Sequence, residues 1–250
     1  MYIDVHCHLD YFKDAEINKV VKECRKKKVN CILTNGVDIK SNREVLEIAK
    51  KHREVKACLG IYPSEGLKMT GSAIMKEIEF IRENAEHISC IGEVGMDFKE
   101  GDKDKTEERQ EELFREFISL AIELDIPVTV HSRKAEEECI KVLERLNAGK
   151  VIMHCFFGNM NLVKRIINNG WMLSIPASVK NSQHFQEVIR LAPIDQLFCE
   201  TDSPFLHPDK RFPNTPANVV ESYKMIAKIK GISLKDAEKR IEENFERLFG

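Results

Sequence analysis

Short apolar runs alternate with amphipathic segments along the whole chain. The apolar runs are continuous, as expected for strands buried on both faces of a parallel sheet, and the amphipathic segments repeat apolar residues at helical spacing. Strands are expected at residues 1–8, 30–35, 55–60, 88–92, 127–130, 150–153, 171–175 and 196–199. Helices are expected at residues 15–27, 41–51, 72–84, 106–124, 135–146, 162–168, 184–191, 217–230 and 234–249, with Thr106 as the N-cap of the fourth.

The order of these elements predicts an α/β fold built from eight strand–helix units. Eight such units in 250 residues match the size of a TIM (β/α)8 barrel. A doubly wound open sheet is the competing topology. No linker rich in proline, glycine or serine divides the chain, and no repeat of fixed period is present. We therefore expect residues 1–250 to form a single barrel domain.

Histidine and carboxylate side chains recur where the predicted strands end. In a barrel, the carboxyl ends of the strands meet at the face on which active sites are built. His6 and His8 are two residues apart in an extended segment, so their side chains point to the same side. The full set of candidate metal ligands is His6, His8, Glu93, His131, His154 and Asp202. Together these residues predict a metal site at one mouth of the barrel.

These ligands are too many for one tetrahedral ion that keeps an open position, so we expect two divalent ions. Glu93, central in strand order, would bridge them. The first ion would be completed by His6, His8 and Asp202, and the second by His131 and His154. A water between two cations loses a proton near neutral pH and becomes a hydroxide nucleophile. Asp202 would orient that water and accept its proton, which makes Asp202 and Glu93 the expected catalytic residues.

Further polar residues near the predicted strand ends are candidates for substrate binding. Arg133, two residues past His131, is placed to hold a phosphate bidentately, although an ion pair with a neighbouring loop is an equal alternative. Asp97 would either reach the site or cap its own loop. Lys210 and Arg211 would more simply be solvated charges of a long loop than contacts to a nucleic-acid backbone.

Composition excludes several classes of protein. The formal net charge of −2 argues against a broad basic face for nucleic acid. The eight cysteines form no C-x-x-C pair, and no secretory signal or membrane span is present, so we expect free thiols in a cytoplasmic protein. Cys7 should point away from His6 and His8, and Cys155 is likewise expected to be packed rather than to bind metal.

Several motifs, spread over nearly the whole chain, resemble those of the TatD-type metal-dependent hydrolases of the amidohydrolase superfamily. They are Tyr2-Ile3-Asp4-Val5-His6-Cys7-His8-Leu9-Asp10, Gly92-Glu93-Val94-Gly95-Met96-Asp97, Pro127-Val128-Thr129-Val130-His131-Ser132-Arg133, Glu200-Thr201-Asp202-Ser203-Pro204 and the closing Asn244-Phe245-Glu246-Arg247-Leu248-Phe249. The resemblance implies a TIM barrel, the two-metal assignment given above, and deoxyribonuclease activity with magnesium or a similar ion.

Three positions depart from that pattern, and all are expected around the substrate pocket. Tyr62 stands where the family often has histidine, Phe98 where many members have tyrosine, and Thr215 where glutamate is common. Tyr62 is therefore a third candidate substrate contact, beside Arg133 and Asp97. The departures concern the substrate, whether DNA or another phosphodiester, and not the metal ligands.

Alternatives to the deoxyribonuclease interpretation stay open from the sequence. An amide or acyl-ester hydrolase of the wider superfamily would use the same ligands, and Arg133 is the feature that favours phosphate. A non-catalytic binding protein would be expected to lack a ligand, and none of the six is lost. Four imidazoles favour zinc-like ions, while two carboxylates leave room for Mg²⁺ or Mn²⁺.

Overall fold

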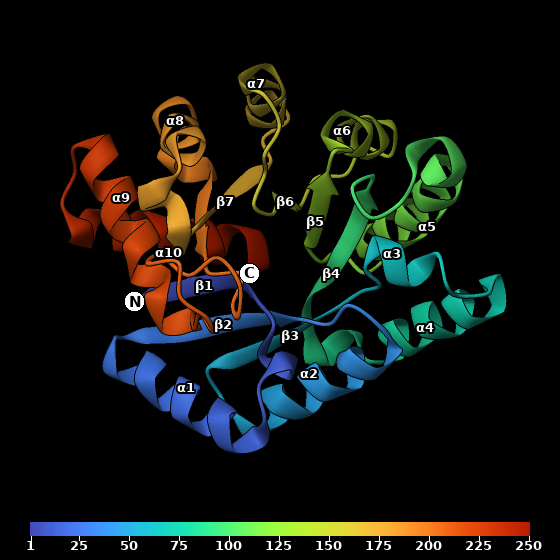
Figure 1. Ribbon diagram of the computed structural model, residues 1–250, viewed down its shortest axis with the longest axis horizontal. Helices are drawn as coiled ribbons and strands as arrows, with labels where there is room; N and C mark the ends of the chain where they lie inside the picture. The colour runs from blue at the N-terminus through green and yellow to red at the C-terminus, as the bar shows by residue number, and fades with distance from the viewer.

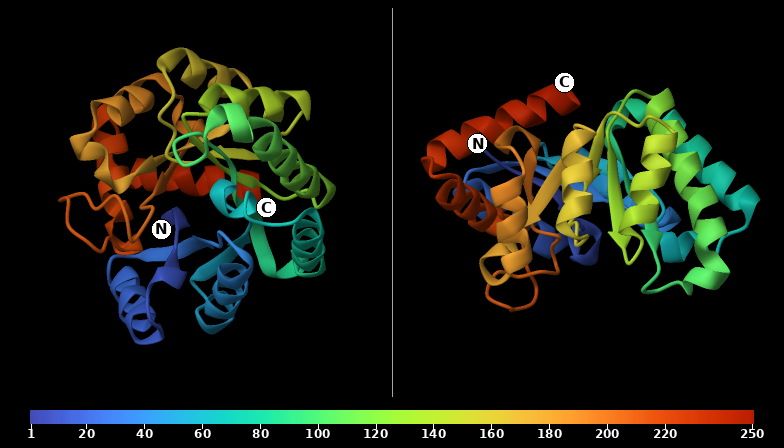
Figure 2. Two further views of the ribbon diagram at one scale, coloured as in Figure 1. Left: turned by 45° about the vertical axis from the view of Figure 1, so that its right-hand side comes forward. Right: turned by 90° about the horizontal axis from the view of Figure 1, so that it is seen from above.

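A parallel eight-stranded sheet forms the centre of the protein in the computed structural model, which describes residues 1–250. Neighbouring strands follow one another in sequence, from β1 through to β8. Figures 1 and 2 show the helices packed outside these strands. The strands are β1 Tyr2–Cys7, β2 Val29–Asn35, β3 Val55–Leu59, β4 Ile88–Asp97, β5 Val128–Arg133, β6 Val151–Met153, β7 Met172–Pro176 and β8 Leu197–Glu200.

At least one helix follows every strand, as predicted. The α-helices are α1 Asp14–Lys26, α2 Ile39–Lys51, α3 Pro63–Gly66, α4 Gly71–Glu83, α5 Lys103–Glu123, α6 Glu136–Arg145, α7 Met160–Asn168, α8 Gln183–Leu191, α9 Val220–Lys230 and α10 Leu234–Phe249. Short 3-10 turns are η1 Leu9–Tyr11, η2 Ala85–His87, η3 Ala177–Asn181, η4 Ile194–Gln196 and η5 Pro216–Val219. The predicted start of α5 was wrong, because the Asp102 carboxylate caps the Asp104 amide and places Thr106 inside the helix.

The first and last strands meet at their carboxyl ends and bring the sheet round into a nearly closed barrel. The Asp202 amide donates to the His6 carbonyl at 2.9 Å, and the His8 amide donates to the Ser203 carbonyl at 2.7 Å. The buried Asp4 carboxylate adds to this junction by accepting hydrogen bonds from the amide and hydroxyl of Thr201, at 3.0 and 2.5 Å. The predicted barrel is confirmed, and the doubly wound alternative is wrong.

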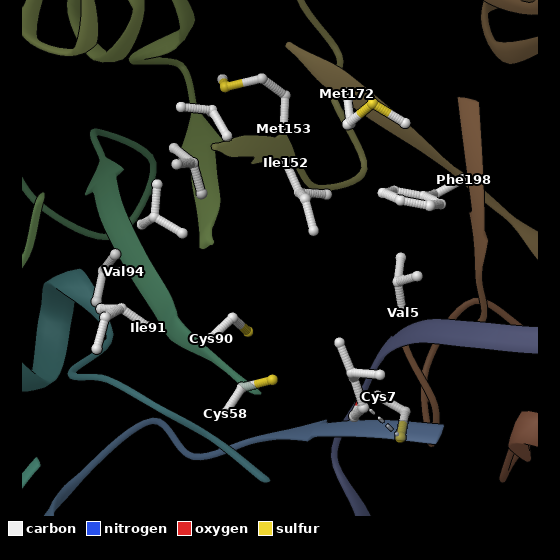
Figure 3. Packing of buried hydrophobic residues seen from close by; sticks show 14 of the residues in the cluster. Val5, Cys7, Cys58, Cys90, Ile91, Val94, Ile152, Met153, Met172 and Phe198 are labelled. Atoms are coloured by element: carbon white, nitrogen blue, oxygen red, sulfur yellow. Dashed lines mark hydrogen bonds between the residues drawn. The ribbon is translucent and has the colours of Figure 1, made fainter. Parts of the chain in front are cut away.

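The strands and helices pack around one continuous hydrophobic core. Figure 3 shows part of this core, with Val5 of β1, Ile91 and Val94 of β4, Ile152 of β6 and Phe198 of β8. All eight cysteines are free thiols, as expected, and seven of them are buried. This packing makes the barrel a solid support, so the ends of its strands are held in fixed positions.

One end of the barrel is covered by the last helix. Asn244 of α10 donates its side-chain amide to the carbonyls of Ile194 and Leu197, at 2.8 and 3.0 Å, where β8 begins. Figure 2 shows α10 crossing the end opposite to the strand tips. The carboxyl end is therefore the accessible one, and the candidate ligands lie there. None of the helices combines the length and apolar composition that crossing a membrane would require.

Candidate metal centre

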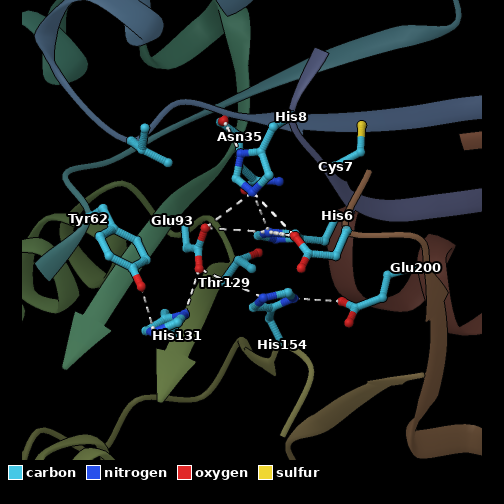
Figure 4. A network of polar contacts seen from close by, with 12 residues as sticks. His6, Cys7, His8, Asn35, Tyr62, Glu93, Thr129, His131, His154 and Glu200 are labelled. Carbon is cyan, nitrogen blue, oxygen red and sulfur yellow. Dashed lines mark hydrogen bonds and ion pairs between the residues drawn. The ribbon is translucent and has the colours of Figure 1, made fainter. Parts of the chain in front are cut away.

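His6 and His8 turn their imidazoles to the same side of β1, as their spacing predicts. Their Nε2 atoms lie 3.2 Å apart, and both side chains are buried (Figure 4). The Asn35 carbonyl accepts the Nδ1 hydrogen of His8 at 3.0 Å, which leaves the Nε2 lone pair of His8 facing the centre. Cys7 points away from both rings and donates its thiol to the Leu33 carbonyl at 3.3 Å. The pair is thus presented in a form that binds a cation.

Glu93 divides its two carboxylate oxygens between two pairs of histidines. Oε2 lies 3.5 Å from Nε2 of both His6 and His8. Oε1 lies 2.8 Å from Nδ1 of His131 and 3.7 Å from Nε2 of His154. Burial alone would raise the pKa of Glu93, but the surrounding imidazoles, His6 first, hold this pKa well below its usual range. The ionised carboxylate therefore stands between two sets of donors, in the place a bridging ligand would occupy.

Local backbone structure allows β4 to bring Glu93 this close to β5. Gly95 has φ 150°, and a Cβ at this position would lie 1.9 Å from the His131 carbonyl oxygen. Any larger residue would therefore push the two strands apart. Gly95 follows Glu93 by two residues, so the glycine-rich motif of β4 serves the close approach of strands that positions the carboxylate.

Asp202 lies beside the first pair of histidines. Its Oδ1 is 3.4 Å from Nε2 of His8 and 3.7 Å from Nε2 of His6, while Oδ2 makes no such contact. Its backbone has φ 51°, a left-handed conformation that aspartate tolerates better than most residues. Burial alone would raise the pKa of Asp202, but the hydrogen bond with His8 and the nearby imidazoles lower it. Asp202 is thus a carboxylate with one oxygen toward the donors and one free.

Asp97 is buried behind His131 and takes both roles that the sequence left open. Its Oδ1 accepts from the amides of Lys99 and Glu100, at 2.7 and 2.9 Å, and so caps the loop after β4. Its Oδ2 lies 3.0 Å from Nε2 of His131 and accepts from the Tyr62 hydroxyl at 2.8 Å. Burial opposes ionisation, yet the hydrogen bonds, that with His131 first, lower the pKa of Asp97 to about 2.

These contacts place Asp97 directly behind His131, and Asp97 does not line the open cavity. With its Nε2 hydrogen donated to Asp97, His131 presents the Nδ1 lone pair to the centre. Tyr62 lies 3.1 Å from His131 Nε2 by its hydroxyl and also lines the open cavity. Its ring is therefore placed between the metal ligands and the solvent side of the site.

Glu200 supports His154 in the same way, a role that sequence reasoning missed. Its Oε2 lies 2.8 Å from Nδ1 of His154 and accepts from the Ser174 hydroxyl at 2.5 Å. Glu200 is fully buried. Burial alone would lower the pKa of His154, but the charge of Glu200 raises it to about 10. The available signal was the position of Glu200 at the end of β8, two residues before Asp202.

The donors present fit divalent metal ions. Ligand atoms lie within 4.8 Å of one another in three overlapping groups, namely His6–His8–Glu93, His6–His154–Asp202 and Glu93–His131–His154. The carboxylates also make the centre attractive to positive charge: burial would lower the pKa of His8, yet Asp202 and Glu93 raise it to about 9. Imidazole and carboxylate together suit zinc, manganese and similar ions. All six predicted ligands thus converge on one place.

A cavity of about 550 Å³ opens onto these donors at the carboxyl end of the barrel. Of the predicted residues, its walls include His8, Tyr62, Glu93, His131, Arg133, His154 and Asp202. His6 and Asp97 lie deeper. Cys155 also lines the cavity, where it is partly exposed, but it packs against the hydrophobic core as expected and belongs to none of the three donor groups. Its backbone is left-handed, φ 42°, so its side chain does not follow the alternation of an extended strand.

Basic residues are unevenly placed around this cavity. Arg133 is exposed at the rim and forms no ion pair with another side chain, so the alternative of a structural pair is wrong. Arg211 pairs with Asp209 at 2.7 Å on the exposed loop after β8, and neither Lys210 nor Arg211 lines the cavity. Arg133 is therefore the guanidinium available to a ligand bound at the centre.

The sequence pattern of the family described as TatD related DNase matches residues 3–250. The chain belongs to this TatD family. It is 34% identical to an uncharacterized metal-dependent hydrolase of Methanocaldococcus jannaschii, over 99% of this chain and 96% of the relative. It is 31% identical to human deoxyribonuclease TATDN3, over 99% of this chain and 94% of the relative.

Solved structures agree with the barrel. The crystal structure of YJJV, a TatD homolog from Escherichia coli, has a TM-score of 0.91 to this chain at 22% sequence identity, covering 99% of this chain and 97% of that one. The fold is therefore shared at low identity. The family assignment and the clusters of metal donors together identify the protein as a TatD-family metal-dependent hydrolase.

Proposed function

We propose that this TatD-family protein is a deoxyribonuclease that hydrolyses phosphodiester bonds with two divalent ions. The observation that carries the proposal is the division of the Glu93 oxygens between two pairs of histidines. Paired metal sites with a shared ligand are typical of nucleases, phosphatases and polymerases. Human TATDN3, at 31% identity, is named a deoxyribonuclease, which supports DNA as the substrate.

In this proposal His6, His8 and Asp202 would hold one ion, His131 and His154 would hold the other, and Glu93 would contribute to both. When bound, divalent ions in such a site acidify water and stabilise negative charge on the phosphoryl oxygens. Asp97 and Glu200 keep His131 and His154 in the orientation that presents a lone pair to the centre. The imidazoles thus enter the reaction already aligned.

Asp202 is the residue we assign to proton transfer. Its Oδ1 faces the imidazoles of His6 and His8, and its Oδ2 is free to accept a hydrogen bond from the attacking water. The lowered pKa of Asp202 keeps its carboxylate ionised near neutral pH, so Oδ2 carries no proton of its own. The guanidinium of Arg133 binds a non-bridging phosphate oxygen from the rim, where its planar set of donors matches phosphate geometry.

A substrate panel tests the proposed function. Protein supplied with Mg²⁺, Mn²⁺ or Zn²⁺ should hydrolyse single-stranded DNA and bis(p-nitrophenyl) phosphate, and chelation should abolish both activities. Release of p-nitrophenol and of labelled DNA fragments would be measured beside hydrolysis of p-nitrophenyl acetate and N-acetyl amino acids. Hydrolysis of an ester or amide without any phosphodiester would instead make the chain an acyl hydrolase and end the proposal.

Replacement of Arg133 by alanine should raise KM for phosphodiesters by about 10-fold or more, since a charged hydrogen bond contributes about 1.5–3 kcal/mol. Metal content should not change, because Arg133 contacts none of the six ligands through a hydrogen bond or ion pair. Arg133→Lys is the matched variant, because lysine keeps the positive charge but loses the planar set of guanidinium donors. Its KM should lie between those of the wild-type protein and Arg133→Ala. Steady-state kinetics and elemental analysis would measure both effects. An unchanged KM in Arg133→Ala would remove this residue from phosphate binding.

A further inference from the structure

Two groups of exposed aromatic side chains stand at the cavity mouth, and the reaction proposed above uses neither. Tyr11 is 58% exposed and Phe205 is 42% exposed on one side, and Phe157 is 57% exposed on another. All three line the cavity of about 550 Å³. Large apolar side chains left open to solvent around a polar centre indicate a surface that binds a ligand.

Phe157 is built as a platform with one free face. Its ring stacks on the imidazole of His184, with ring centroids 5.2 Å apart and an angle of 12° between planes. Phe185 supports it edge-on at 4.8 Å, and His184 is fixed by a contact of 2.9 Å from Nε2 to the Phe156 carbonyl oxygen. One face of Phe157 is covered by His184, so its exposure comes from the opposite face and the edge. A planar group could continue this stack.

Tyr11 and Phe205 form the second group, which lies beside the other pair of metal ligands. Their rings meet edge to face with centroids 5.5 Å apart, although Tyr11 comes from η1 and Phe205 from the loop after β8. Both also approach the imidazole of His8, with centroids 5.8 and 6.4 Å away. Because both rings contact the buried side chain of His8, they lie next to the candidate metal centre.

The two groups belong to different parts of the cavity wall. Tyr11 and Phe205 adjoin His8, which faces one Glu93 oxygen, whereas Phe157 lies in the segment after β6 that also carries His154, which faces the other oxygen. A phosphodiester in DNA also has two flanking groups, the nucleosides on its two sides, and each carries a planar base. Arg133, the cationic residue at the rim, remains for the phosphate between them.

Resting on the proposed function, we infer that the two aromatic groups bind the two nucleobases on either side of the scissile phosphate. One base stacks on the free face of Phe157, and the other packs on Tyr11 and Phe205. Aromatic stacking accepts any base because every base presents a π face. The subsites therefore need unpaired bases and confer little sequence preference.

Three dinucleotides test this inference: thymidylyl-thymidine, and the same molecule with the 5′ or the 3′ base replaced by an abasic residue. Base–aromatic stacking accounts for about 5- to 150-fold in binding per base. Phe157→Ala should lower kcat/KM for the intact dinucleotide by a factor in this range. In this variant, removing the base that stacks on Phe157 should not lower kcat/KM any further. Removing the base that packs on Tyr11 and Phe205 should lower kcat/KM as much as it does in the wild-type protein. Tyr11→Ala and Phe205→Ala should show the opposite pattern.

Matched variants separate stacking from general apolar contact. Phe157→Tyr should retain the discrimination between dinucleotides, and Phe157→Leu should not. Phe212→Ala is the control, because Phe212 is 74% exposed on the same loop as Phe205 but does not line the cavity. Where a dinucleotide is not turned over, its inhibition constant against bis(p-nitrophenyl) phosphate gives the same comparison.

Two results would overturn the inference. Either the variants leave the three dinucleotides unaffected, or they weaken all three by one common factor, which would mean that the rings only support His8 and His154. Failure of the proposed function looks different, since wild-type protein would then hydrolyse no phosphodiester with any of the three ions.

Discussion

Replacement of Asp202 by asparagine should lower kcat on phosphodiesters by about 100-fold or more while the protein still binds divalent ions. Asparagine keeps the size and one oxygen ligand but loses the charge and the basicity of the carboxylate. Positioned general bases typically contribute 10²–10⁴-fold. The remaining five ligands stay in place, so metal affinity should fall far less than turnover. Steady-state kinetics at saturating Mn²⁺ and calorimetric titration would measure the two effects separately.

The control for this variant is Asp125→Asn, which removes an exposed carboxylate that pairs with Lys150 at 3.0 Å, by the start of β5. It should leave turnover unchanged. Near-normal turnover in Asp202→Asn at saturating metal would show that another group accepts the proton. The free Oδ2 of Asp202 would then have no catalytic role.

Replacement of Glu93 by glutamine should weaken the binding of both ions. Each oxygen of Glu93 faces a different pair of histidines, so the loss of one charge affects two sites. We expect at least about 100-fold weaker binding, since loss of an outer-shell partner already costs 10–100-fold. Isothermal titration calorimetry with Mn²⁺ and Zn²⁺, supported by thermal unfolding to confirm the fold, would measure this.

Asp97→Asn is the matched comparison, because Asp97 is a buried carboxylate that contacts only one of the ligands, His131. It should weaken one site by about 10–100-fold and spare the other. Two unaltered sites in Glu93→Gln would remove Glu93 from the bridging position, whatever the outcome for Asp97→Asn.

The barrel and the convergence of the six candidate ligands could be predicted from sequence because both depend on local rules. Continuous apolar runs indicate buried parallel strands, and a polar residue just after such a run lies at the carboxyl end of the barrel. His6 and His8 needed only the alternation of an extended chain. The predicted convergence of six residues from β1, β4, β5, β6 and β8 follows from the closure of the sheet.

The supporting residues and the substrate side could not be predicted in this way, since they depend on contacts between residues that are far apart in the sequence. Asp97 meets Tyr62, and Glu200 meets Ser174, only after separate strands are brought together. The partial exposure of Cys155 to the cavity could not be predicted, because its left-handed backbone does not follow strand alternation. Tyr11 and Phe205 lie far apart in the sequence, and no local pattern indicates that their rings meet.

The central claim is that this end of the barrel holds two ions joined by Glu93. Crystals grown with Mn²⁺, or soaked with Zn²⁺, and measured on both sides of the metal absorption edge test it directly. The account predicts two anomalous peaks, one among His6, His8 and Asp202 and one between His131 and His154, each within ligand distance of a Glu93 oxygen. A single peak that Glu93 does not touch, or peaks only elsewhere on the molecule, would contradict it.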